Sequence, residues 1–169
     1  MRHRTANQTR FAVTHARPPV ELELTATPDT PTRTAIAQSM LAYNETLLGP
    51  PDTSPLAVLV RSAGNAEVAG GLWGRTSHGW LFVEMVFLPD ALRGRHIGED
   101  LIRMAEAEAL KRGCIGAWLD TFSRGAQRFY ERQGYQPFGE IGDHPPGHSR
   151  CFMLKRFDSK SHRQGPEPA

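Results

Sequence analysis

The sequence has few cysteines and no long apolar segment, and both absences exclude classes of protein. Only Cys114 and Cys151 are present among its 169 residues, too few for a disulfide scaffold or an all-cysteine zinc site. No apolar run approaches the roughly 20 residues that a membrane-spanning helix needs, so we expect no membrane association. The two thiols are predicted to be reduced and buried, which favours a cytoplasmic protein.

Acidic residues are missing from the first 20 positions, which hold four arginines. The net charge of +2 therefore comes from the two ends of the chain, and the part between them is acidic overall. A nucleic-acid-binding domain concentrates positive charge on one folded face, so we expect no nucleic-acid partner. A tail-driven nucleic-acid binder and an organelle transit peptide are the alternatives that the arginines leave open.

Length and composition predict a single domain, since 169 residues suffice for one substantial core. Residues 1–17 are Arg-rich, lack periodicity and lack the apolar core of a secretory signal, so we expect a flexible tail. The domain is predicted over residues 18–157, and residues 158–169 form a second flexible tail.

The spacing of apolar residues predicts seven strands and three helices. Strands are expected at Val20–Leu24, Leu56–Arg61, Val68–Arg75, Trp80–Leu88, Ile115–Leu119, Tyr135–Ile141 and Cys151–Phe157, and helices between Asp29 and Gly49, at Ile97–Arg112 and at Ala126–Gln133. Because the two kinds of element are interleaved, the fold class is a mixed α/β sheet with helices on both faces.

The turn from Leu92 to Gly98 carries the densest signal. It connects a strongly apolar strand to a helix, and it contains Arg93, Gly94 and Arg95. Free N–H groups at a helix N-terminus bind anions, and glycine lets a phosphate approach the backbone. The glycine spacing does not fit a dinucleotide fingerprint, and the Gly-Lys-Ser/Thr ending of an ATP-binding loop is absent. A basic, solvated helix start is the structural alternative.

This turn resembles the acyl-CoA motif of the GNAT superfamily of N-acetyltransferases, written Arg/Gln-x-x-Gly-x-Gly/Ala. His96 departs from the pattern, since the family usually has glycine there. A second segment, from Asp120 to Tyr135, resembles the family's helix near the cofactor thiol. Its Ala126, Tyr130 and Gly134 follow at intervals of four, although Ser123 replaces a common asparagine. The predicted order of elements also matches the family, whose central sheet is mostly antiparallel with about six to seven strands.

The resemblance implies an acetyl-CoA-dependent N-acetyltransferase that transfers an acetyl group directly to a primary amine. The amine would belong to an unidentified small molecule or peptide, and a homodimer is a state that such relatives commonly adopt. The cofactor-binding residues that it implies are Val86, Phe87, Leu88, Arg93, Gly94, Arg95, His96, Ile97, Gly98, Glu99, Ser123 and Tyr130. A β-bulge near the first three would splay two strands and open a slot for the pantetheine arm. A non-catalytic acyl-CoA-binding or regulatory module is the alternative.

Three residues are candidates for proton transfer. By family analogy Tyr130 lies near the cofactor sulfur, and a phenol with a pKa near 10 can protonate the leaving thiolate. Glu84 interrupts the most apolar strand, where desolvation would raise its pKa and suit a general base. Asp120, at the end of the next strand, is the rival base, and a water chain without a dedicated base is a third option.

The loop between the last two strands contains His144 and His148. Two histidines are too few to hold a metal ion and prolines separate them, so no metal site is expected. Relatives use this region to wall the acceptor site, and a plain surface loop is the alternative. The acidic centre of the chain favours a cationic or amine acceptor.

Overall fold

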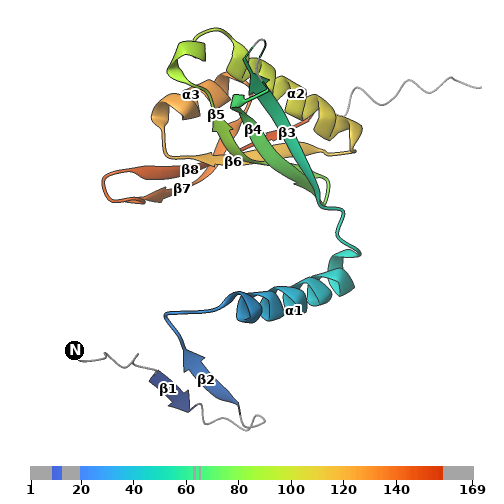
Figure 1. Ribbon diagram of the computed structural model, residues 1–169, viewed down its shortest axis with the longest axis vertical. Coiled ribbons are helices and arrows are strands. Elements are labelled where there is room, and N and C mark those ends of the chain that lie inside the picture. The colour runs from blue at the N-terminus through green and yellow to red at the C-terminus, as the bar shows by residue number, and fades with distance from the viewer. Residues whose placement is uncertain (1–8, 13–19, 63, 65, 158–169) are drawn as a thin grey trace, which may run out of the picture. The chain divides into compact units, whose positions relative to one another are not determined.

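The computed structural model describes residues 9–12, 20–62, 64 and 66–157. The chain forms two compact units, and the boundary between them along the sequence falls between Pro50 and Pro51. Each unit is described by itself. Figure 1 labels the elements of both units. The C-terminal tail predicted at residues 158–169 and most of the predicted N-terminal tail lie outside the described residues.

The first unit consists of a hairpin and a helix. Strand β1 (Thr9–Ala12) pairs antiparallel with β2 (Glu21–Leu24). Part of the segment expected to be a tail is therefore a strand, because the alternating Glu-Leu sequence of β2 offers it a partner. Helix α1 (Thr30–Leu48) begins as predicted. The side chain of Asp29 accepts a hydrogen bond from the Thr32 N–H (2.8 Å), and proline occupies its first turn.

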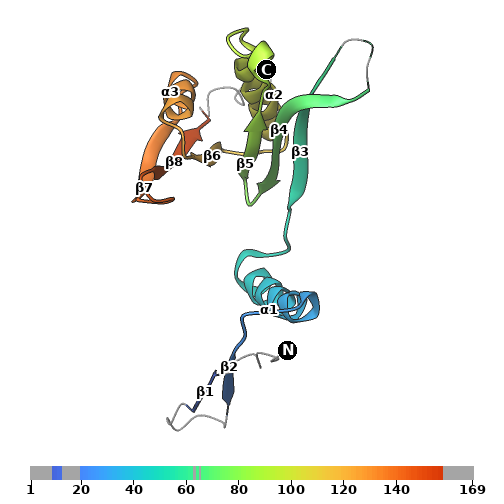
Figure 2. The same cartoon turned by 60° about the vertical axis from the view of Figure 1, so that its left-hand side comes forward.

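The second unit is built on one six-stranded sheet. Its strands are β3 (Ser54–Arg61), β4 (Val68–Ser77), β5 (Trp80–Phe87), β6 (Gly116–Thr121), β7 (Gln136–Gly142) and β8 (Ser149–Arg156). They lie in the order β3-β4-β5-β6-β8-β7, which can be followed in Figure 2. Every neighbouring pair is antiparallel except β5 and β6. The predicted mixed, mostly antiparallel sheet is confirmed.

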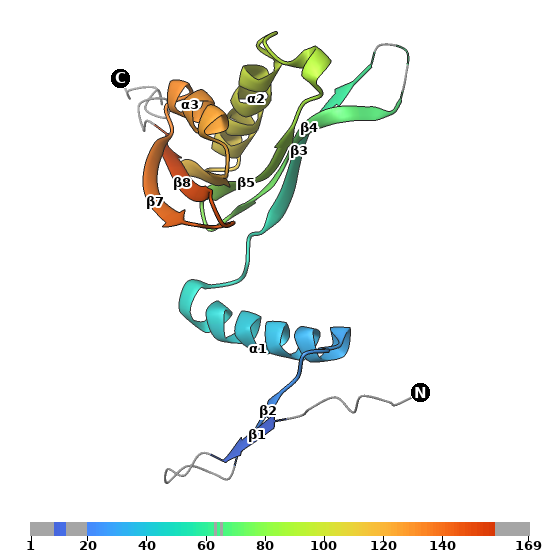
Figure 3. The ribbon, with the colours of Figure 1, turned by 90° about the vertical axis from the view of Figure 1, so that its left-hand side faces the viewer.

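Two helices pack on one face of this sheet. The third helix, α1, belongs to the first unit, so the expected helices on both faces are not found within the second unit. Helix α2 (Ile97–Lys111) and helix α3 (Arg124–Arg132) contribute to the same core cluster, and Figure 3 shows both on the same side of the sheet. Along α2, Leu101, Ala105 and Ala109 recur every four residues and are buried, as expected for one helical face. They meet inward-facing strand residues such as Leu81 and Met153, which are 0% exposed.

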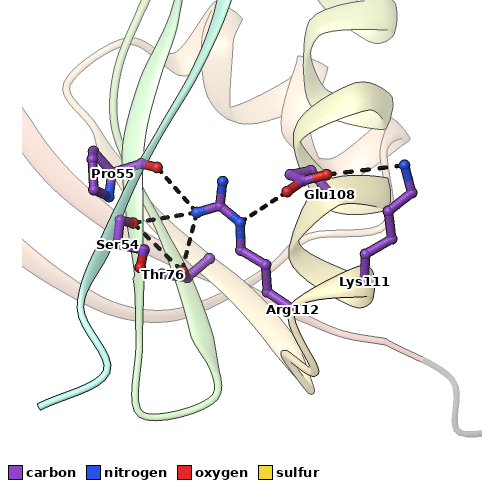
Figure 4. Close-up of polar contacts among 6 residues, drawn as sticks. All are labelled: Ser54, Pro55, Thr76, Glu108, Lys111 and Arg112. Carbon is purple, nitrogen blue, oxygen red and sulfur yellow. Dashed lines mark hydrogen bonds and ion pairs between the residues drawn. The ribbon is translucent and has the colours of Figure 1, made fainter.

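An arginine ties the C-terminal end of α2 to the beginning of the sheet. The Arg112 guanidinium donates to the Glu108 carboxylate (3.0 Å), to the carbonyl oxygens of Ser54 (3.4 Å) and Pro55 (3.0 Å), and to the Thr76 hydroxyl (3.4 Å). Figure 4 shows these contacts converging on one side chain. Its positive charge also suits the negative end of the helix dipole.

Strands β5 and β6 separate halfway along their length. Their pairing runs from Trp80 opposite Gly116 to Val83 opposite Leu119, and β5 then continues to Phe87. At this point Gly74 of β4 pairs with Val83 while Trp73 pairs with Met85, so Glu84 is an extra, bulged residue. A Cβ on Gly74 would collide with the Phe82 carbonyl oxygen. The expected bulge and splay are therefore present.

Candidate functional site

A cavity of about 560 Å³ opens where the end of β5 meets the beginnings of α2 and α3. We call it the α2–α3 cavity. Of the residues predicted to bind the cofactor, those that line it are Val86, Phe87, Leu88, Arg93, Gly94, His96, Gly98, Glu99, Ser123 and Tyr130. Arg95 is exposed and Ile97 packs against the core, and neither lines the cavity.

The turn before α2 presents backbone donors to this cavity. The first backbone bond of the helix runs from the Asp100 N–H to the His96 carbonyl (3.1 Å). The N–H groups of Ile97, Gly98 and Glu99 therefore have no partner within the helix, and the positive end of its dipole lies beside them. Gly94 adopts φ +70°, a left-handed conformation that favours glycine. These features fit an anionic ligand such as a pyrophosphate.

His96 occupies a left-handed position as well, with φ 61° and ψ 2°. This explains why the family whose motif this turn resembles favours glycine there, since a side chain costs about 1–2 kcal/mol in that conformation. The imidazole is 80% exposed and its Nδ1 lies 3.1 Å from the Glu99 carboxylate. The side chain thus contacts α2 and does not fill the cavity.

The two arginines that line the α2–α3 cavity have different surroundings. Arg93 donates from Nε to the Leu88 carbonyl (3.0 Å) and pairs with Asp90 (2.7 Å). Both contacts are to nearby residues of the chain, so its side chain stabilises the turn itself. Arg132, at the end of α3, lines the cavity and forms no ion pair with another described residue. Sequence reasoning missed Arg132, because nothing in the pattern of a short helix places its last turn beside the turn of another.

The other lining residues absent from the sequence prediction are Leu92, Gly125, Ala126 and Phe129. Ala126 stands within the second motif, which was the available signal. Phe129, expected to be core, both packs against the core and lines the cavity. A Cβ on Gly98 would lie 3.3 Å from the Phe129 ring. Glycine at this position therefore lets α2 and α3 approach each other at the cavity wall.

Tyr130 is 8% exposed and lines the α2–α3 cavity. Its ring meets those of Phe129 and Tyr135 edge-on, with centroids 5.1 and 5.8 Å away. Burial raises the pKa of Tyr130 to about 12. The phenol is therefore protonated at neutral pH, and its hydroxyl forms no hydrogen bond with another described residue.

The two candidate bases both lie in ion pairs. Glu84, on the bulge, pairs through one carboxylate oxygen with Arg75 of β4. Asp120, at the end of β6, engages both oxygens with Arg150 at 2.7 and 2.9 Å. Neither lines the α2–α3 cavity. Glu84 is the first residue beyond the last β5–β6 pair, so it stands at the point where the strands separate.

A second cavity of about 780 Å³ lies between the first turn of α3 and the hairpin of β7 and β8. We call it the β7–β8 cavity. Ser123 lines both cavities. The connecting loop supplies Asp143 and His148 to the lining, while the His144 ring lies 6.0 Å from the Phe122 ring. His144 and His148 therefore do not meet at a common site in the cavity lining.

Both cysteines are free and buried, as predicted. Burial raises the pKa of each thiol, so neither has the lowered pKa of a reactive nucleophile. Among residues 9–12, 20–62, 64 and 66–157, no cluster of three potential metal ligands occurs. Within the same described ranges, no helix is both long and apolar enough to cross a membrane.

Comparison with known proteins assigns a family. Residues 23–135 match the Acetyltransferase (GNAT) family. The acetyltransferase Atu2258 of Agrobacterium fabrum is 43% identical over 123 residues, which are 73% of this chain and 89% of that protein. The blasticidin-S acetyltransferase of Streptomyces morookaense is 39% identical over 92 residues, or 54% of this chain and 68% of that one. A crystal structure of an Agrobacterium tumefaciens acetyltransferase superposes with a TM-score of 0.75 at 41% identity, covering 79% of this chain and 97% of that chain.

Proposed function

Because the chain belongs to the GNAT acetyltransferase family and is an acetyltransferase, we propose that it moves the acetyl group of acetyl-CoA directly onto an amine. The observation that carries this proposal is the α2–α3 cavity. Two motifs that are distant in the sequence, the turn before α2 and the helix α3, line this one cavity.

The cavity offers complementary groups to each part of acetyl-CoA. Backbone N–H groups at the start of α2 and the Arg132 guanidinium would hold the phosphates. The separated edge of β5 at Val86 and Leu88 has backbone groups that β6 does not engage, and these would bond the pantetheine arm as a neighbouring strand does. Holding both reactants in line then supplies much of the rate enhancement.

Tyr130 is proposed as the general acid. The amine nitrogen forms a bond to the thioester carbonyl carbon and loses one proton to a base, Glu84 or water. The carbon–sulfur bond breaks, and the sulfur takes up the phenolic proton. Solvent then reprotonates the phenolate. Burial suits this role, because the raised pKa keeps Tyr130 protonated throughout the neutral range.

Glu84 is the better of the two candidate bases. Both Asp120 oxygens accept from Arg150. Glu84 uses one oxygen for Arg75, and its other oxygen accepts no hydrogen bond from another described residue. Glu84 also lies where β5 and β6 separate. Glu84→Gln should lower kcat at neutral pH and shift the acidic limb of the pH profile. An unchanged profile would favour proton loss through water.

The alternative of a non-catalytic acyl-CoA-binding module has less support. His96 motivated it, and its side chain is 80% exposed and contacts Glu99, so it leaves the cavity open. The relatives described above are named as acetyltransferases. The two free cysteines fit the reducing cytoplasm that the sequence suggests.

Calorimetric titration with acetyl-CoA tests the proposal. We expect micromolar binding by the unaltered chain and its loss in Gly98→Trp, whose side chain must displace the Phe129 ring from the cavity wall. Lys111→Trp, on the exposed last turn of α2, is the matched control and should bind normally. Circular dichroism must show that both variants are folded. Absence of binding by the unaltered chain would refute the proposed function.

A further inference from the structure

The β7–β8 cavity is placed to receive the acceptor, and this inference rests on the proposed function. The first turn of α3 divides the two cavities. Gly125 and Ala126 face the α2–α3 cavity, whereas Arg124 and Gln127 face the β7–β8 cavity. An acetyl group held beside Ser123 would therefore be within reach of an amine seated on the other side of this turn. A volume of about 780 Å³ is of the size that holds small-molecule ligands.

The charges on the walls of the β7–β8 cavity are of both signs. Arg124 lines it from α3, and Glu140 lines it from β7. Within the described part of the chain, neither side chain forms a hydrogen bond or an ion pair, and they do not pair with each other. The neighbouring Asp120 and Arg150 differ, since they satisfy one another in a two-bond ion pair.

The remaining titratable groups of the lining do not neutralise the charges of Arg124 and Glu140. Asp143 accepts a hydrogen bond from the Gly147 N–H at 2.8 Å, which commits one of its oxygens to its own loop. His148 is the other titratable lining group besides the buried Cys151. The cavity thus keeps one unpaired cation on the helix wall and one unpaired carboxylate on the strand wall. The Asp143 carboxylate, which also has no ion pair with another described residue, adds negative charge on the connecting loop.

The carboxylate of Glu140 lies on the side of the sheet that faces the cavity. Glu140 stands opposite Cys151 in the β7–β8 ladder, so both side chains leave the sheet on the same face. Cys151 also lines the cavity. Burial is the main cause that raises the pKa of its thiol, and the negative charge of Glu140 adds to the effect. This agrees with a carboxylate directed toward the cavity and not only toward bulk water.

We propose that the acceptor is an amine that also carries a carboxylate and a second basic group, as a diamino acid does. Arg124 binds the carboxylate, Glu140 binds the second cation, and the remaining amine faces Ser123. A simple diamine would leave Arg124 unpaired. An amino acid with one basic group would leave Glu140 unpaired. Arg124 and Glu140 are therefore specificity-determining residues.

Three amines with related chains separate these possibilities. Lysine carries all three groups, 1,5-diaminopentane lacks the carboxylate, and 6-aminohexanoate lacks the second amine. Release of CoA thiol is measured with each at a saturating concentration of acetyl-CoA. We expect kcat/KM to be highest for lysine, by about two- to fivefold over either partner, the effect of one exposed charge pair.

Two variants assign each charge to its residue. Glu140→Gln should lower kcat/KM for lysine and 1,5-diaminopentane and leave 6-aminohexanoate unchanged. Arg124→Gln should lower it for lysine and 6-aminohexanoate and leave the diamine unchanged. Glu108→Gln and Lys111→Gln make the same charge changes at the far end of α2 (Figure 4) and should alter none of the three values.

Two results would overturn this inference while leaving the proposed function intact. The first is equal kcat/KM for the three amines, or variants that change all three alike. The second is normal acetyl-CoA binding, lost in Gly98→Trp, with no acetylation of any of the three. Failure of the proposed function itself looks different, because acetyl-CoA would then not bind at all.

Discussion

At the scale of single residues, the hydroxyl of Tyr130 is the group whose loss should matter most to turnover. Tyr130→Phe removes the proposed acid and keeps the ring that packs on Phe129 and Tyr135. We expect kcat to fall about 100-fold, within the range of general acid catalysis, with the Kd for acetyl-CoA changed by less than about threefold. Stopped assays of CoA release and calorimetry measure the two quantities.

Tyr135→Phe is the matched control for that experiment. Tyr135 is also a buried tyrosine, at 2% exposure, but it does not line the α2–α3 cavity. Its variant should keep kcat. If Tyr130→Phe turned over as fast as the unaltered enzyme, Tyr130 would have no role as the acid.

His96 gives a second prediction, because its left-handed backbone shapes the anion-binding turn. His96→Gly should keep the Kd for acetyl-CoA within about threefold, since glycine adopts this conformation freely. His96→Val should raise the Kd at least tenfold, because a β-branched residue is strained at positive φ. Calorimetry distinguishes the two variants. Equal affinities would mean that the turn does not need this conformation to bind.

Single residues also mark where sequence reasoning stops. The positive φ of His96 could be suspected from the glycine that the resembling family has there. The ion pairs of Glu84 with Arg75 and of Asp120 with Arg150 could not, because they depend on which strands become neighbours. The placement of Arg124 and Glu140 on opposite walls of one cavity could not be predicted either, because it also depends on which elements become neighbours.

At the scale of secondary-structure elements, the sequence predicted almost everything in the second unit. Each expected strand and helix there is present within about two residues of its expected ends, because periodicity, capping residues and glycine stops are local signals. The 3-10 turn at Asp90–Leu92 was missed, since it is too short to show periodicity. The pairing at residues 9–12 was missed because it depends on a partner strand.

The arginine that ties α2 to the sheet leads to a prediction about the stability of these elements. Arg112→Met keeps the aliphatic stem but leaves the Ser54 and Pro55 carbonyls without this donor. We expect the free energy of unfolding to fall by about 1–3 kcal/mol, the usual contribution of hydrogen bonds that a charged side chain donates. Urea denaturation measures this quantity.

Lys111→Met is the neighbouring control, because Lys111 is highly exposed and its only ion pair with another described residue spans 3.9 Å. Its effect should stay within about 0.5 kcal/mol. Equal destabilisation by both variants would show that the contacts of Arg112 with the sheet add nothing to stability.

At the scale of the whole molecule, two buried tyrosines make stability depend on alkaline pH. Burial raises the pKa of Tyr130 to about 12, and burial followed by the charge of Glu106 raises that of Tyr135 further. The unfolded chain releases these protons near pH 10. The native state then holds more protons than the unfolded state, so the contribution of these two tyrosines to stability is constant below pH 10 and decreases as pH rises above it.

Urea midpoints at pH 8 and pH 10.5 measure that decrease. The double variant Tyr130→Phe/Tyr135→Phe has no such protons to hold and should lose less stability over the same interval. Absorbance at 295 nm adds a direct observation, since these two phenols should ionise only after the chain unfolds. Their ionisation near pH 10 in the folded protein would contradict the prediction.

The division of the two cavities by one turn of α3 has a consequence for steady-state kinetics. Among the described residues, Ser123 alone lines both cavities, so occupation of one leaves most of the other accessible. Double-reciprocal plots should therefore intersect, as for a ternary complex, and should not be parallel. Product CoA should compete with acetyl-CoA but not with the amine.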